Sequence, residues 1–195
     1  KKVIGIYRDH MNISLNVIGY SQKMVFSMRA FGTDLGNMTV TRIMTADSTE
    51  VITMNSIGKL KLLWIDREDE TLHEVRYKKG KFVSSNYRHY EKGVLKKWCY
   101  ITWDGKAYQV NSHKGKSTIT EVPTYSIASL YYYSPNNVNR LFYEAEGTFN
   151  EVKHPDANTV DFKTSEGNRN VYKYVNGKLQ EMEFHLSIAT VTMKR

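Results

Sequence analysis

Glycine-centred turn signals recur along this chain at intervals of roughly ten residues, which is the spacing of successive β-hairpins. Asn-Gly and Asp-Gly pairs favour the positive φ angles that a two-residue hairpin turn requires. The clearest of these signals are Lys79-Gly80, Lys92-Gly93, Asp104-Gly105 and Asn176-Gly177. The spacing therefore predicts a series of antiparallel strands.

The segments between the turns alternate apolar and polar residues, as half-buried strands do. Residues 180–190 give the clearest case, and 37–44, 82–91 and 94–104 follow the same pattern. These strands would be about nine to eleven residues long, against the usual five or six. Strands of that length predict an all-β fold, a long antiparallel meander that forms a barrel or a strongly curved half-barrel sheet.

One segment interrupts the hairpin rhythm between Pro123 and Pro135. Ile127 and Leu130 have helical spacing there, and Ser126 precedes them as a capping residue, so we expect a short helical turn near 126–133. No low-complexity linker divides the chain. We therefore expect a single β domain over residues 1–195, with residues 1–20 as a peripheral strand or arm.

Aromatic residues make up 12% of the chain, and many of them gather in two places. Tyrosines crowd around the helical interruption, and tryptophans occur in a central strand. Such side chains either fill the end of a curved sheet as core or line a surface that binds lipid tails or sugars. The candidates for ligand binding are Trp98, Trp103, Tyr131, Tyr133 and Tyr143.

The net charge of +8 attracts anionic partners in general. Many of the lysines, however, flank glycines in predicted turns, where lysine discourages edge-to-edge pairing of sheets. Because no basic tract or nucleic-acid motif accompanies the charge, the sequence argues against a nucleic-acid partner.

The sequence contains no run of about 18 apolar residues, so it predicts no membrane-spanning helix. Cys99 is the only cysteine and stands between Trp98 and Tyr100, so we expect a packed strand residue and not a reactive thiolate.

Glu144 and Glu146 are the best candidates for catalysis, because two carboxylates on one strand face can serve as an acid–base pair. The alternative is an ordinary solvated face with Arg140 as the counter-ion.

The six histidines are scattered singly, although His73 and His89 would be diagonal neighbours across the hairpin that turns at Gly80. Their spacing predicts no metal site, and nucleophile-elbow and phosphate-loop signatures are absent, so no cofactor is expected.

Three stretches resemble the motifs of an uncharacterised bacterial family, a domain of unknown function found mainly in Bacteroidetes and proteobacteria. They are SIASLYYYSP at 126–135, VNRLFYEAEG at 138–147 and NVYKYVNGKL at 170–179. The resemblance covers residues 22–192. It implies an exported all-β protein, akin to the half-barrel sheets of periplasmic lipoprotein carriers, and it supplies no catalytic residues.

These features together predict a non-enzymatic protein of the bacterial envelope, in the periplasm or associated with the outer membrane, whose signal peptide lies outside the given sequence. Its curved sheet would bind a lipid or another apolar or amphiphilic small molecule. One alternative is a structural or protein–protein interaction module with an envelope protein as its partner. The other is a glycan hydrolase that uses Glu144 and Glu146.

Overall fold

The computed structural model describes residues 19–62, 65–134 and 138–195, with the side chains of 62 and 65 left aside. The arm predicted for residues 1–20 therefore lies almost wholly outside the described residues. The strands are β1 (Ser21–Ala30), β2 (Thr33–Met44), β3 (Thr49–Leu62), β4 (Ile65–Lys78), β5 (Lys81–Glu91), β6 (Val94–Trp103), β7 (Tyr108–Ser112), β8 (Gly115–Ile119), β9 (Arg140–Tyr143), β10 (Thr148–Lys153), β11 (Thr159–Lys163), β12 (Arg169–Val175), β13 (Lys178–His185) and β14 (Thr190–Lys194).

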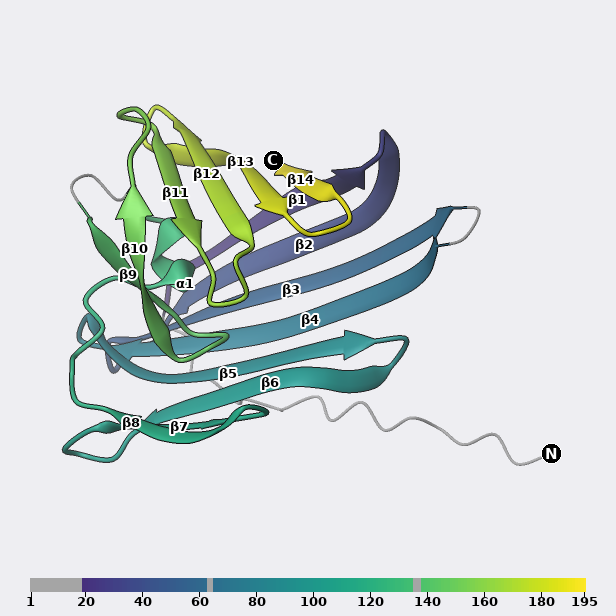
Figure 1. The fold of residues 1–195 in the computed structure, drawn as a ribbon. Coiled ribbons are helices and arrows are strands. Elements are labelled where there is room, and N and C mark those ends of the chain that lie inside the picture. The colour runs from purple at the N-terminus through teal and green to yellow at the C-terminus, as the bar shows by residue number, and fades with distance from the viewer. Residues whose placement is uncertain (1–18, 63–64, 135–137) are drawn as a thin grey trace.

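The fourteen strands of the described residues belong to one antiparallel sheet with the order β8-β7-β6-β5-β4-β3-β2-β1-β14-β13-β12-β11-β10-β9. The sheet consists of two meanders, β1–β8 and β9–β14, joined where β1 pairs with β14 through Met28 and Met193. Strands β8 and β9 form the two edges, so the barrel is not closed by backbone hydrogen bonds. Figure 1 shows the sheet curling until the second meander lies opposite β3–β6. The predicted curved all-β sheet is confirmed.

The turns have the geometry that their residues predict. Asn176 and Gly177 have φ angles of 51° and 72°, and Lys79 and Gly80 have 49° and 74°. Two consecutive positive φ angles define the turn whose twist matches that of the flanking strands. Register shifts occur in four of the strand pairs, between Met28/Arg29, Arg76/Tyr77, His89/Tyr90 and Lys173/Tyr174. Bulges of this kind bend a strand and increase its twist, which explains how such long strands curl.

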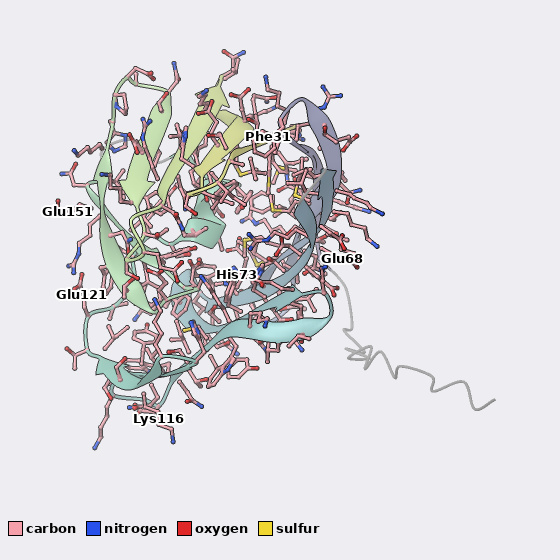
Figure 2. The ribbon with its side chains drawn as sticks, turned by 45° about the vertical axis from the view of Figure 1, so that its right-hand side comes forward. Phe31, Glu68, His73, Lys116, Glu121 and Glu151 are labelled. Atoms are coloured by element: carbon pink, nitrogen blue, oxygen red, sulfur yellow. The ribbon has the colours of Figure 1, made fainter. Side chains whose placement is uncertain are left out.

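Side chains hold the two meanders together where the edges lack hydrogen bonds. The rings of Phe82 and Phe142 are 5.4 Å apart, between β5 and β9. A Cβ atom on Gly147 would lie 2.8 Å from the Val110 side chain, so the turn after β9 lies directly against β7. Figure 2 shows His73 inside the ring of strands and acidic residues such as Glu151 on its outer side. The result is a sheet with one enclosed face.

The predicted helical turn is also confirmed. Helix α1 (Ile127–Leu130) occupies one end of the enclosed space, and all four of its residues are buried. Ser126 is the N-cap residue, its backbone N–H donates to the Ser129 hydroxyl at 3.4 Å, and its own hydroxyl contacts the Tyr77 hydroxyl of β4. Within the described part of the chain, no helix has both the length and the hydrophobicity needed to cross a bilayer.

Candidate functional site

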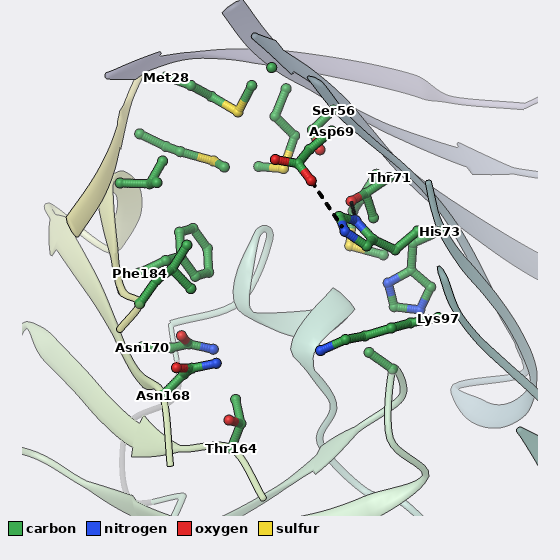
Figure 3. A pocket seen from close by; sticks show the side chains of 18 of the residues that line it. Met28, Ser56, Asp69, Thr71, His73, Lys97, Thr164, Asn168, Asn170 and Phe184 are labelled. Atoms are coloured by element: carbon green, nitrogen blue, oxygen red, sulfur yellow. Dashed lines mark hydrogen bonds and ion pairs between the residues drawn. The ribbon is translucent and has the colours of Figure 1, made fainter. Parts of the chain in front are cut away.

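The enclosed face of the sheet surrounds a cavity of about 490 Å³. One wall comes from β1–β6, the opposite wall from β12–β14, and α1 forms the floor (Figures 1 and 3). Small-molecule sites generally measure about 300–1,000 Å³, so the cavity has the volume of a ligand site.

Most of the cavity surface between the two walls is apolar. Four methionines contribute to it, and because their unbranched side chains adapt to irregular shapes, they suit a surface that accommodates flexible molecules. The apolar lining includes Met28, Leu35, Met38, Met54, Leu60, Tyr131, Tyr172, Phe184, Val191 and Met193. Strand alternation places them together: Met54 faces inward from β3 while Ile57, at a position of opposite parity, is 49% exposed.

One group of polar side chains, here called the polar end, lies on one side of the cavity, and a second group lines the β3–β5 wall: Ser56, Arg67, Asp69, Thr71, His89 and Glu91. In the polar end, Thr164, Asn168 and Asn170 line the cavity from the β11–β12 region, and Figure 3 shows them facing His73 and Lys97 of the opposite wall. The cavity therefore combines apolar with polar surface, as an amphiphilic molecule does.

His73 is buried in this polar end and is neutral. Its Nε2 atom lies 3.0 Å from the Ser85 hydroxyl, and its ring meets that of Tyr87 edge-on at 5.4 Å. Burial lowers the pKa of His73 to about 3, so the imidazole carries no charge at neutral pH. The register pairs Thr71 with His89 and His73 with Tyr87, which makes the two histidines diagonal neighbours as predicted.

Asp69, His89 and Glu91 form a cluster at the edge of the cavity, with potential ligand atoms within 4.8 Å of one another. Imidazole and carboxylate groups can bind a divalent metal. The Arg67 guanidinium, however, lies 2.8 Å from Asp69 and 3.3 Å from Glu91 and already compensates both carboxylates. The cluster is therefore organised as an ion-pair network, and the absence of a metal site stays a prediction.

The structure brings together some of the aromatic residues singled out in the sequence. Tyr131 and Tyr143 line the cavity, whereas Trp98, Trp103 and Tyr133 are not among its lining residues. Trp98 stacks on Tyr100 with ring centroids 5.2 Å apart, on the outer face of β6. The tryptophan pattern was ambiguous because it does not say which parity of β6 faces inward.

The inward parity of β6 is that of Lys97, Cys99 and Ile101. Cys99 and Ile101 are fully buried, and burial raises the pKa of the Cys99 thiol to about 12, so the thiol is inert as expected. Sequence reasoning missed the methionine lining. Its signal was present in the alternation of Met24, Phe26 and Met28 along β1, every one of which is buried.

Glu144 and Glu146 do not share a strand face, and that expectation is wrong because β9 ends at Tyr143 and both glutamates lie in the following turn. Arg140, expected as their counter-ion, instead pairs with Glu121 at 2.8 Å. Glu146 lines the cavity and accepts a hydrogen bond from the Ser165 backbone N–H at 3.0 Å.

Glu144 is fully buried outside the cavity lining, and its two oxygens accept the backbone N–H groups of Ile127 and Ala128 at 3.1 Å each. These are the N–H groups that a helix leaves without partners at its first turn. Burial raises the pKa of Glu144 to about 7, against the opposing effect of its hydrogen bonds. The contacts make Glu144 the anchor of α1, and they bring no substrate-accessible acid–base pair together.

Comparisons with known proteins agree with this architecture. No curated protein matches the sequence. Among solved structures, the fold is similar to the crystal structure of a beta-barrel-like protein of the domain of unknown function DUF1849 from Brucella abortus. The TM-score is 0.57 and the identity 14%, over 88% of this chain and 94% of that one, so the likeness concerns the fold alone. Residues 26–195 match the family described as domain of unknown function (DUF6134), and the chain therefore belongs to that uncharacterised family.

Proposed function

We propose that the protein binds one amphiphilic small molecule in the cavity between its two sheet walls and performs no chemistry on it. The observation that carries this proposal is the cavity itself, which has about 490 Å³ of space and a lining made mainly of methionine, aliphatic and aromatic side chains. A lipid chain would lie between Met38 and Met54 on one wall and Phe184 and Val191 on the other.

The affinity would come from apolar surface removed from water, which contributes about 25 cal/mol per Å² before the cost of ordering the ligand is subtracted. The adaptable methionines favour a flexible chain over one rigid shape. Export to the bacterial envelope belongs to the same proposal, supported by the resemblance of 126–135, 138–147 and 170–179 to an exported family.

The non-enzymatic part of the proposal rests on the two glutamates. Glu144 uses both carboxyl oxygens to hold α1, and Glu146 accepts the Ser165 N–H from a separate turn. A glycosidase needs two carboxyl groups that both reach the substrate. Because Glu144 is fully buried and does not line the cavity, this pair offers no support for the hydrolase alternative.

A titration with the neutral fluorophore N-phenylnaphthylamine tests the proposal. Its emission is expected to increase and saturate as one molecule enters the apolar cavity of each chain. Native mass spectrometry of protein purified from cells is expected to detect a bound amphiphile. A protein that gives neither saturable fluorescence nor any bound mass would contradict the proposal.

A further inference from the structure

The polar end of the cavity contains largely buried side chains that make no side-chain hydrogen bond to any described residue. Asn170 is 4% exposed and Thr164 is 9% exposed, and both line the cavity. The Thr164 hydroxyl has no hydrogen-bond partner in the described part of the chain. The Asn170 amide makes no hydrogen bond to any described residue. Leaving a buried group such as the Thr164 hydroxyl unpaired costs about 1–3 kcal/mol, so buried polar groups in native proteins are nearly always paired.

The unpaired groups converge from both walls. Figure 3 shows Asn170, Asn168 and Thr164 on one side, with His73 opposite. The Nε2 atom of His73 bonds to Ser85, and its Nδ1 atom has no hydrogen-bond partner among the described residues. A ligand group placed between the walls could therefore meet an amide, a hydroxyl and a neutral imidazole, each able to donate or accept.

The lysines and arginine that line the cavity already have carboxylate partners. Lys59 lies 3.0 Å from Glu68, and Arg67 pairs with Asp69 and Glu91. At the polar end, Lys97 lies 2.7 Å from Glu166. The Lys114 ammonium joins this pair in a larger ion-pair network, because it lies 3.8 Å from Glu166 and 3.9 Å from Glu146.

Within the described part of the chain, each of the four cations that line the cavity therefore has a carboxylate partner. The four are Lys59, Arg67, Lys97 and Lys114. A carboxylate or phosphate head would have to displace one of the existing partners. A cationic head would likewise compete with a lysine or arginine for its glutamate. Since desolvating an unpaired charge is costly, the cavity disfavours heads of either sign.

We propose that the ligand is an amphiphile with an uncharged head of hydroxyl, ester or amide groups, which binds between Asn170, Thr164 and His73. This inference rests on the proposed function and specifies the ligand class for the same cavity. The apolar chain extends along the methionine wall, and the head supplies the hydrogen bonds that Asn170 and Thr164 lack. A monoacylglycerol has this chemistry.

Displacement of N-phenylnaphthylamine tests the inference with three amphiphiles of equal chain length: monolaurin, laurate and dodecyltrimethylammonium. Monolaurin, the uncharged one, is expected to bind at least about tenfold more tightly than either ion, a difference of about 1.4 kcal/mol. Laurate that displaces the probe as well as monolaurin does would overturn the inference while leaving the proposed function intact. Failure of the probe itself to bind would instead reject the proposed function.

Two nearly isosteric variants identify the head contacts. Asn170→Leu is expected to weaken monolaurin about tenfold and to leave the affinity for N-phenylnaphthylamine unchanged. Thr164→Val should act in the same direction. Because neither variant removes a hydrogen bond to a described residue, neither is expected to lower the thermal stability of the ligand-free protein.

The matched control is Asn86→Leu. Asn86 also has a buried, unpaired side-chain oxygen, but it is not among the residues that line the cavity. This variant should bind monolaurin with wild-type affinity. Equal monolaurin affinity in Asn170→Leu and the wild type, with the probe still bound, would show that Asn170 does not contact the head.

Discussion

Ser56→Trp is expected to abolish binding of N-phenylnaphthylamine and monolaurin while leaving the protein folded. Ser56 lines the cavity from β3 between Met54 and Gly58. An indole at this small residue would occupy the space that the ligand chain needs. We expect the affinity to fall at least about 30-fold, equivalent to about 2 kcal/mol. The protein should remain folded because the added side chain enters a cavity and not a filled core.

The matched control is Ile57→Trp, one residue further along the same strand. Ile57 is 49% exposed, and its side chain points away from the cavity because successive strand residues face opposite sides. Fluorescence titrations and thermal unfolding of both variants provide the comparison, and Ile57→Trp should bind the probe normally. If Ser56→Trp unfolds cooperatively and still binds the probe with wild-type affinity, the ligand binds elsewhere.

Glu144→Gln is expected to remove the contribution of one buried carboxyl to the pH dependence of the free energy of unfolding between about pH 4.5 and pH 7, and to leave the opposite contribution of buried His73 in place. Burial raises the folded-state pKa of Glu144 from 4.5 to about 7, so the folded carboxyl binds its proton more tightly than the unfolded one. Its contribution to stability is therefore greatest below the unfolded pKa. That contribution is lost as the pH rises towards 7, by about 3 kcal/mol.

Urea unfolding of the wild type and Glu144→Gln over this pH range gives the measurement. At low pH the wild type should be the more stable protein, because a glutamine amide must present an N–H₂ group to Ile127 or Ala128, whose N–H groups also donate. The difference should shrink by about 3 kcal/mol by about pH 8. Glu146→Gln leaves the buried carboxyl in place and should keep the wild-type pH dependence. Parallel curves for the wild type and Glu144→Gln would contradict the assigned role.

The local features of the fold could be predicted because they depend on short stretches of sequence. The Asn176-Gly177 turn follows from the φ angles that these residues tolerate, and it has those angles. The alternation in 180–190 predicts one strand with a wet and a dry face, and this is right only as far as His185, where β13 ends. Met182 is fully buried, whereas Leu186 and Ile188 lie in the turn that follows β13 and are exposed. The helical turn near 126–133 was visible as a break in the strand pattern.

The long-range arrangement could not be predicted in the same way. The pairing of β1 with β14 joins Met28 to Met193, far apart in the sequence, and no local signal encodes it. The same limit affected the site. Trp98 looked like a ligand residue but lies on the outer face of β6, whereas Asn170 looked ordinary and is buried at the polar end of the cavity. Such roles depend on which strand face becomes the inside.

Glu144 illustrates a second reason for a wrong expectation. Two glutamates at i and i+2 share a face only if the strand continues, and β9 ends one residue before Glu144. The carboxyl then turns towards the backbone of α1, whose N–H groups need acceptors. The partner lies 17 residues away in the sequence, so residue spacing alone could not reveal it.

NMR spectra of methyl-labelled methionine test the central claim, that the cavity binds an apolar chain, most directly. Met28, Met38, Met54 and Met193 line the cavity, whereas Met44 at the end of β2 does not. Titration with N-phenylnaphthylamine or monolaurin is predicted to shift the first four methyl signals together and to leave that of Met44 in place. Unchanged signals for the four cavity methionines at saturating ligand would contradict the account.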